Sequence, residues 1–194
     1  MIQLFSLLSK LPLWLLHALG WLLGWLSFLL SPSYRRKFRE NVVQAGYRWA
    51  SVRGAVGGAG RMVGELPRLW LGAPTHCEWE NDACVERAYA AGRGVVFLTP
   101  HLGCFEISAQ GLASRYAGRY GPLTVLYRPA RQPWLAKLMQ AARDRPGLKT
   151  APTSLAGVRQ MIRSLRNGHA VGLLPDQVPP DGMGTWAPFL GRDA

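Results

Sequence analysis

Hydrophobic residues are distributed unevenly along the chain, with one unbroken apolar run near its beginning. From residue 11 to residue 30 the sequence reads LPLWLLHALGWLLGWLSFLL, twenty residues without a formal charge when His17 is neutral. A helix of about 20 apolar residues matches the hydrocarbon thickness of a bilayer. The run therefore predicts a helix that spans a membrane or is embedded in its surface, with a buried core helix as the alternative.

A second region, residues 37–71, carries apolar residues at roughly helical intervals. The glycine-rich segment GAVGGAG at 54–60 interrupts this pattern. It lacks the lysine and the hydroxyl residue of a phosphate-binding loop. We therefore interpret it as a site of close helix packing or as a kink.

From residue 83 onward, strand-like and helix-like patterns alternate. Short apolar runs bounded by glycine, proline or polar residues predict strands, and longer stretches with apolar residues three or four apart predict helices. The predicted strands are 95–99, 123–127, 148–151 and 170–174, and the predicted helices are 83–91, 105–116, 133–143 and 155–166. This alternation is typical of an α/β protein with a largely parallel sheet flanked by helices.

His101 lies two residues beyond the first predicted strand, and Glu106 follows five residues later. In α/β proteins, ligands bind beyond the carboxyl ends of strands. On one continuous helix this separation would turn the two side chains about 140° apart, so we expect His101 before a helix and Glu106 in its first turn, with Gly103 supplying the bend. Glu106 would then hold one ring nitrogen of His101 and leave the other to accept a proton as a general base. The alternative is a loop histidine and a surface carboxylate.

Polar residues also follow two other predicted strands. Arg128 follows the predicted strand 123–127, and Asp176 with Gln177 follows the predicted strand 170–174. Arg128 is either an anion clamp on a phosphate or a developing oxyanion, together with main-chain donors near Gly103, or a solvated surface residue. Asp176 is either a turn residue before two prolines or a part of the site. Arg143, at the end of a predicted helix, contacts either the substrate or the helix dipole at the surface.

The charges that flank the apolar run are asymmetric. One cation, Lys10, precedes the run, and four follow it within ten residues, namely Arg35, Arg36, Lys37 and Arg39. By the positive-inside rule, the C-terminal side of the run is predicted to face the cytoplasm. A cleaved secretory signal would have the reverse order of charge.

The net charge of +12 predicts anionic partners. Residues 31–75 carry eight Lys and Arg residues against two Glu, which suits acidic lipid headgroups. Residues 119–166 carry ten against Asp144 alone, where a phosphorylated substrate or an acidic carrier could dock. No nucleic-acid-binding module accompanies this charge, so we expect no nucleic-acid partner. The three cysteines form no CxxC pair, and we expect reduced thiols, no metal and no cofactor.

Four short motifs follow the anchor and its basic neighbour in a familiar order. They are HLGCFE at 101–106, YRP at 127–129, LPDQ at 174–177 and PFLG at 188–191. A His-x4-Glu element alone has little specificity, but the four together at these spacings are specific. Over essentially its whole length, the chain resembles the bacterial lipid A biosynthesis acyltransferases, the lauroyl/myristoyl transferase family.

The resemblance implies a lysophospholipid-acyltransferase-like fold at the cytoplasmic face of the bacterial inner membrane. It also implies transfer of a fatty acyl chain from acyl carrier protein to a hydroxyl of an anionic lipid A precursor. We expect a membrane anchor at 1–34, a basic helical region at 35–75 and an acyltransferase domain at 76–194. Family members continue beyond the Phe-x-Gly element, so we expect a C-terminally truncated chain. The alternatives are another glycolipid or glycerophospholipid acceptor, or an inactive membrane-anchored fragment that binds lipid.

Overall fold

The computed structural model describes residues 2–128, 130, 132–143, 145–176, 182, 184–189 and 192–193. The chain forms two compact units. The first comprises residues 2–10 and 67–176, and the second comprises residues 11–66 with the described residues beyond 176. The α/β region predicted from the alternating patterns lies in the first unit.

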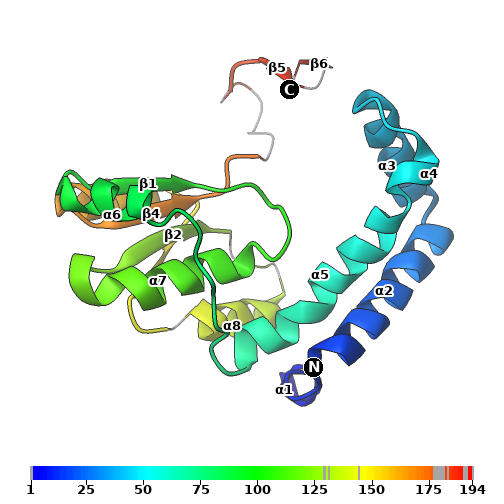
Figure 1. The fold of residues 1–194 in the computed structure, drawn as a ribbon, viewed down its shortest axis with the longest axis horizontal. Helices are drawn as coiled ribbons and strands as arrows, with labels where there is room; N and C mark the ends of the chain where they lie inside the picture. The colour runs from blue at the N-terminus through cyan, green and yellow to red at the C-terminus, as the bar shows by residue number, and fades with distance from the viewer. Residues whose placement is uncertain are drawn as a thin grey trace. The chain divides into compact units, whose positions relative to one another are not determined.

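A four-stranded parallel sheet forms the centre of the first unit (Figure 1). Its strands are β1 (Val95–Leu98), β2 (Leu123–Tyr127), β3 (Leu148–Pro152) and β4 (Ala170–Leu173), in the spatial order β1-β4-β2-β3. The predicted α/β class with a parallel sheet is confirmed. Because all four strands run in the same direction, their carboxyl ends lie at one edge of the sheet.

Helices cover both faces of this sheet. Consecutive residues of a strand point to opposite faces, so their contacts show which helix lies on which face. Leu123 belongs to the same buried cluster as Tyr116 of α7 (Glu106–Tyr120). The next residue, Thr124, meets Ser164 of α9 (Leu155–Arg166) through a hydroxyl–hydroxyl hydrogen bond of 2.9 Å. Helices α7 and α9 therefore lie on opposite faces.

Three further helices belong to the first unit, namely α1 (Ile2–Leu8), α6 (Ala83–Ala90) and α8 (Pro133–Arg143). The predicted boundaries of α8 and α9 match the structure, whereas α7 runs four residues beyond its predicted end. The extra turn brings Tyr120 onto Tyr89 of α6, with ring centroids 4.6 Å apart. Gly121 then ends the helix with a φ of +83°, a conformation that glycine adopts readily.

The second unit is built mainly from helices. They are α2 (Leu13–Leu30), α3 (Pro32–Gln44), α4 (Trp49–Val52) and α5 (Gly54–Leu71), the last of which continues into the first unit. Ser31 separates α2 from α3, and its hydroxyl caps α3 by accepting a hydrogen bond from the Tyr34 amide. A short antiparallel pair, β5 (Pro188–Phe189) and β6 (Arg192–Asp193), also belongs to this unit.

Helices α2 and α5 pack backbone against backbone through glycines. A Cβ atom at Gly60 would lie 2.0 Å from the carbonyl oxygen of Gly20, and one at Gly24 would lie 2.6 Å from that of Val56. The contacts run in opposite directions along the two helices, so the pair is antiparallel. The interpretation of the 54–60 glycine run as a site of close helix packing is confirmed.

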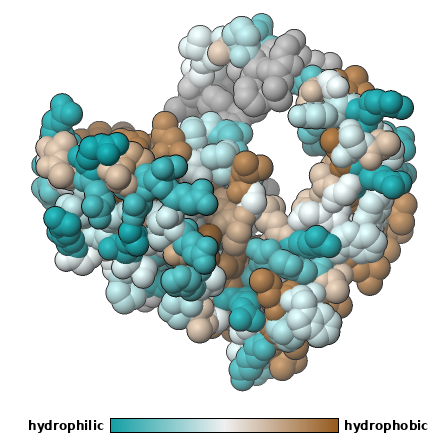
Figure 2. Space-filling model, viewed as in Figure 1, coloured by the Kyte–Doolittle hydropathy of each residue, from teal (hydrophilic) through white to brown (hydrophobic). Residues whose placement is uncertain are grey.

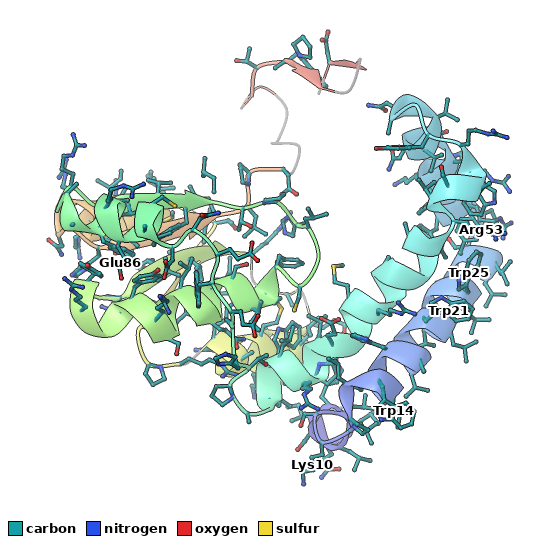
Figure 3. All side chains as sticks on the ribbon, viewed as in Figure 1. Lys10, Trp14, Trp21, Trp25, Arg53 and Glu86 are labelled. Atoms are coloured by element: carbon teal, nitrogen blue, oxygen red, sulfur yellow. The ribbon has the colours of Figure 1, made fainter. Side chains whose placement is uncertain are left out.

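The rest of α2 is apolar and largely exposed. Its buried residues form one stripe at intervals of four, Leu16, Gly20, Gly24 and Phe28. Figure 2 shows hydrophobic side chains along α2, and Figure 3 shows three of its tryptophans, Trp14, Trp21 and Trp25. By length and composition, α2 is the one helix within the described ranges that qualifies as a membrane span.

Candidate active site

The carboxyl edge of the sheet gathers the residues that the sequence singled out after the strands. His101 follows β1, Arg128 follows β2 and Asp176 follows β4. In the sheet, β4 lies between β1 and β2. The three residues therefore come from three adjacent strands, and His101 and Asp176 come from directly neighbouring ones.

The strand register explains why His101 and Asp176 meet. Leu98 of β1 pairs with Leu173 of β4, and the Thr99 amide donates to the Leu173 carbonyl at 3.1 Å, which extends the ladder beyond the strand. His101 and Asp176 each lie three residues beyond the paired leucines. The two residues thus continue the same register and emerge side by side at the edge.

Asp176 holds His101 by two hydrogen bonds. The His101 amide donates to Oδ2 of Asp176 at 2.7 Å, and ring nitrogen Nδ1 lies 2.7 Å from Oδ1. The backbone bond, followed by the ring bond, lowers the pKa of Asp176 below its ordinary value of 3.8. An ionised carboxylate only accepts hydrogen bonds, so Nδ1 carries the proton that it donates to Asp176.

When His101 is neutral, this arrangement leaves its second ring nitrogen without a proton. In a neutral imidazole one nitrogen donates and the other accepts, so Nε2 is the acceptor. About a third of each side chain is exposed, 34% for His101 and 38% for Asp176. The ring also packs edge-on against Phe105, with ring centroids 4.7 Å apart. The geometry is that of an accessible imidazole whose ring contacts a carboxylate and an aromatic side chain.

The expected pairing of His101 with Glu106 is wrong in its partner. His101 precedes α7 and Glu106 is the first residue of that helix, as predicted, and Gly103 between them has a φ of +58°. The Glu106 carboxylate, however, pairs with Arg143 of α8, with Oε1 3.0 Å from Nη2. Its second oxygen accepts a hydrogen bond from the Trp70 indole at 3.3 Å.

Glu106 and Arg143 form a largely buried ion pair, with 14% of each side chain exposed. The guanidinium also lies over the ring of Tyr127, the last residue of β2, 5.8 Å from its centroid. The pair connects the start of α7, the end of α8 and the end of β2. Arg143 is thus not the surface residue that one interpretation predicted.

The other predicted site residues are less constrained. Arg128 lies directly after β2, and its side chain is exposed. A Cβ atom at Gly103 would meet open space, so only its backbone conformation favours glycine there. Gln177 lies outside the described residues, as do Leu190 and Gly191 of the PFLG motif.

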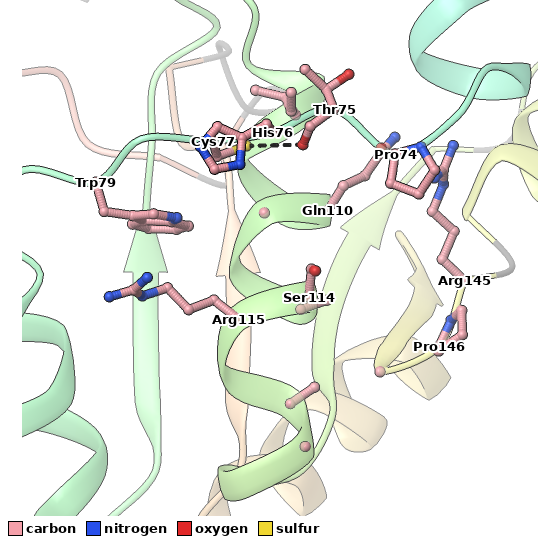
Figure 4. Close-up of a pocket in the computed structure, with 16 residues that line it drawn as sticks. Pro74, Thr75, His76, Cys77, Trp79, Gln110, Ser114, Arg115, Arg145 and Pro146 are labelled. Atoms are coloured by element: carbon pink, nitrogen blue, oxygen red, sulfur yellow. Dashed lines mark hydrogen bonds between the residues drawn. The ribbon is translucent and has the colours of Figure 1, made fainter.

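A groove of about 910 Å³ lies elsewhere in the first unit, along α7 (Figure 4). It is lined by residues 74–77 and 79, by one side of α7 and by residues 145–147. Neither His101 nor Asp176 lines it. In the ranges that the structure describes, no three His, Cys, Asp or Glu side chains gather into a metal site.

Sequence reasoning missed two contacts of the site. The sequence indicates Asp176 as a candidate site residue but not as the partner of His101, although both residues lie two positions beyond a predicted strand. That equal offset is a usable signal once β1 and β4 are known to be neighbours. The Trp70 contact to Glu106 has no comparable signal, because it joins helices 36 residues apart in sequence.

The fold and this edge define the class of the protein: a parallel α/β protein with a histidine–aspartate pair at the carboxyl ends of its strands. The sequence model of the bacterial lipid A biosynthesis acyltransferases matches residues 4–194, and the chain belongs to this family. The family resemblance seen in the motifs is confirmed, with acyl transfer in lipid A biosynthesis as the general activity. No curated protein compared with the chain matches it.

Proposed function

We propose that the chain transfers a fatty acyl group from an acyl carrier protein thioester to a hydroxyl of a lipid A precursor, with His101 as general base. The observation that carries this proposal is the 2.7 Å contact between Nδ1 of His101 and Asp176. A proton on Nδ1 that is donated to Asp176 would leave Nε2 of the neutral ring able to accept one, which supports the proposal. A hydroxyl needs such a base, because it is a weak nucleophile while it keeps its proton.

The proposed reaction is a direct transfer. Nε2 of His101 takes the hydroxyl proton while the hydroxyl oxygen bonds to the thioester carbon. The tetrahedral intermediate then collapses, the carbon–sulfur bond breaks, and the proton passes from the imidazolium to the thiolate of the carrier. Asp176 stabilises the imidazolium in between, as the carboxylate of a catalytic triad does. No acyl-enzyme is required, because the thioester is already activated.

The negative charge that develops on the thioester oxygen needs a donor. Arg128 is exposed at the same edge of the sheet, after a neighbouring strand, and we assign it this role together with main-chain amides near Gly103. Glu106 and Arg143 act as positioning residues in this scheme. Their ion pair fixes the start of α7, five residues after the base.

The charge of the chain fits the proposed partners. Residues 119–166, with ten cations against one acidic residue, suit an acidic carrier protein and the phosphates of the acceptor. The apolar helix α2 and the cations around it suit a membrane surface, where the lipid acceptor resides. We place this activity at the cytoplasmic face of the bacterial inner membrane.

The test is an acyl-transfer assay with the complete chain in lipid vesicles. Purified acyl carrier protein thioester is the donor, and the acceptors are a lipid A precursor, glycerol-3-phosphate and a neutral glycolipid. We expect acylation of the lipid A precursor. We expect His101→Ala to lower the rate by about a hundredfold or more, which is the usual contribution of a general base.

A matched histidine provides the control. His76 lies in the first unit and lines the groove along α7 rather than the strand edge, so His76→Ala should keep most of the rate. Transfer at the normal rate by His101→Ala would refute the base assignment. Acylation of glycerol-3-phosphate alone would refute the acceptor, and no transfer to any of the three would refute the proposed reaction.

A further inference from the structure

The first helix of the chain belongs to the same unit as the strand edge. Phe5 of α1 stacks on Trp70, with ring centroids 6.1 Å apart, and also contacts the ring of Trp134 in α8 at 6.2 Å. The chain leaves this unit after Lys10 and returns to it at Pro67. Residues 2–10 and the candidate active site therefore lie on the same side of any membrane. The intervening segment must cross that membrane an even number of times or not at all.

A single crossing by α2 conflicts with this connectivity. Only α5 could provide the return crossing, since it runs antiparallel to α2 and touches it from Leu16 through Gly24. A Cβ atom at Gly64 of α5 would lie 2.7 Å from the Leu16 carbonyl oxygen, and one at Gly60 would meet Gly20. If this part of α2 enters a bilayer, residues 56–64 of α5 must therefore enter it to the same depth.

Helix α5 is poorly suited to the hydrocarbon core. It carries Arg61 and Glu65 within the stretch that lies along α2, and Glu65 is only 2.6 Å from Nε2 of His17. Each ionised side chain at the centre of a bilayer costs about 2.5–3.5 kcal/mol even on the most lenient scales. A hairpin that crosses the whole membrane would place these groups inside it.

The exposed side of α2 nevertheless needs an apolar environment. Nine of its large hydrophobic side chains are exposed, with Trp14 at 70% and Leu30 at 73%, and together they form a continuous apolar surface. Residues 11–66 also carry seven Lys and Arg residues against two Glu. Helix α2 itself carries no Lys or Arg, so its exposed face suits acyl chains, whereas the cations of the helices that follow it suit acidic headgroups.

We propose that α2 and α5 form a hairpin embedded in one leaflet, and that α2 does not cross the bilayer. An 18-residue helix is roughly 27 Å long, whereas one leaflet offers roughly 15 Å of hydrocarbon. Helix α2 therefore lies at a shallow angle, with its exposed leucines and tryptophans in the acyl chains. The cations of the second unit contact acidic headgroups. This inference concerns the membrane contact alone and does not depend on the proposed reaction.

Three cysteine positions distinguish the possible topologies. Ser6→Cys reports on α1, Ala50→Cys reports on α4 at the far end of the hairpin, and the native Cys84 reports on the first unit; all three positions are exposed. Each is tested alone, with the remaining native cysteines replaced by serine. A charged maleimide is added to sealed membrane vesicles of known orientation, and labelling after detergent lysis gives the total.

We expect all three cysteines to react from the same face of the membrane. Vesicles that expose this face to the reagent should give at least about tenfold more labelling before lysis than vesicles of the opposite orientation. The reason is that a charged reagent does not cross the hydrocarbon core. Labelling of Ser6→Cys from the opposite face to the other two would show that α2 crosses alone. Labelling of Ala50→Cys from the opposite face would show that both helices cross. Either result overturns the proposal, and neither depends on enzymatic activity.

Discussion

Two carboxylates near His101 have different contacts, and replacing each by its amide should have different consequences. In Asp176→Asn the side chain keeps its shape but presents an oxygen and an NH2 group to His101. If the NH2 group faces Nδ1, it donates to that nitrogen, and the proton moves to Nε2. The ring then has no acceptor for the substrate proton. The same change in a buried protease triad lowers kcat about 10⁴-fold.

The expected effect here is smaller because Asp176 is partly exposed. With 38% of the side chain accessible, water competes for both hydrogen bonds. We expect a fall of about a hundredfold in the rate of acyl transfer, with a small but measurable loss of stability. Glu106→Gln should instead leave Arg143 largely buried without a counter-ion, and lower the free energy of unfolding by about 2 kcal/mol.

Rates and unfolding curves for both variants test this division. The assay is initial acyl transfer in lipid vesicles, and unfolding is followed by circular dichroism in detergent with increasing urea. The reasoning is refuted if Asp176→Asn transfers acyl groups at the normal rate. It is also refuted if Glu106→Gln is fully stable but inactive, because Glu106 would then act on the reaction rather than on the packing of α7 against α8.

The Asp176 contact should also depend on pH. Its pKa is lowered in the folded chain, so its contribution to stability is present above the ordinary value of 3.8 and is lost as the pH falls through the lower folded value. We expect the difference in urea midpoint between the unmodified chain and Asp176→Asn to disappear in that acidic range. A difference that persists unchanged at the lowest pH would contradict the hydrogen bonds to His101.

Two further predictions concern the second unit. Gly60→Ala should destabilise the α2–α5 pair by about 1–3 kcal/mol, because the new Cβ would meet the Gly20 backbone. Gly58→Ala should instead stabilise α5 by up to about 1 kcal/mol, because its Cβ would lie in open space. Thermal unfolding of the two variants would show the opposite signs, and equal shifts would argue against the glycine contact. Leu22→Glu on the exposed side of α2 should lower the fraction bound to anionic vesicles by about tenfold. Leu155→Glu, on α9 and also exposed, should not lower it. Equal loss of binding in the two variants would mean that α2 is not the surface that meets lipid.

Local sequence patterns were enough to predict most elements of the first unit. The strand at 123–127 and the helices at 133–143 and 155–166 have the predicted bounds, because each is an apolar or periodic run between clear turn residues. The order of the strands was not predictable in this way. The placement of β4 between β1 and β2 depends on packing between segments far apart in sequence.

The same limit explains which part of the site was missed. Residues 95–106 alone are enough to predict that His101 is a candidate site residue and that it lies between a strand and a helix. The identity of its carboxylate partner depends on the neighbour of β1, which is β4, 75 residues further along the chain. Glu106 is close to His101 in sequence, but the Glu106 carboxylate is bound by Arg143 and Trp70.

The two carboxylates give the His-x4-Glu spacing a physical meaning under the proposed mechanism. The loop that carries His101 is held at both ends: Asp176 binds the amide and ring of His101, and five residues later the buried Glu106–Arg143 pair fixes the start of α7. A longer or shorter spacer would move one end relative to the other and tilt the ring. Glutamate thus sets the position of the loop and aspartate sets the tautomer of the base. Arg143 already neutralises Glu106, so Asp176 is the carboxylate that stabilises a proton accepted by His101 in this mechanism. Because Asp176 binds Nδ1, Nε2 stays open to the acceptor hydroxyl.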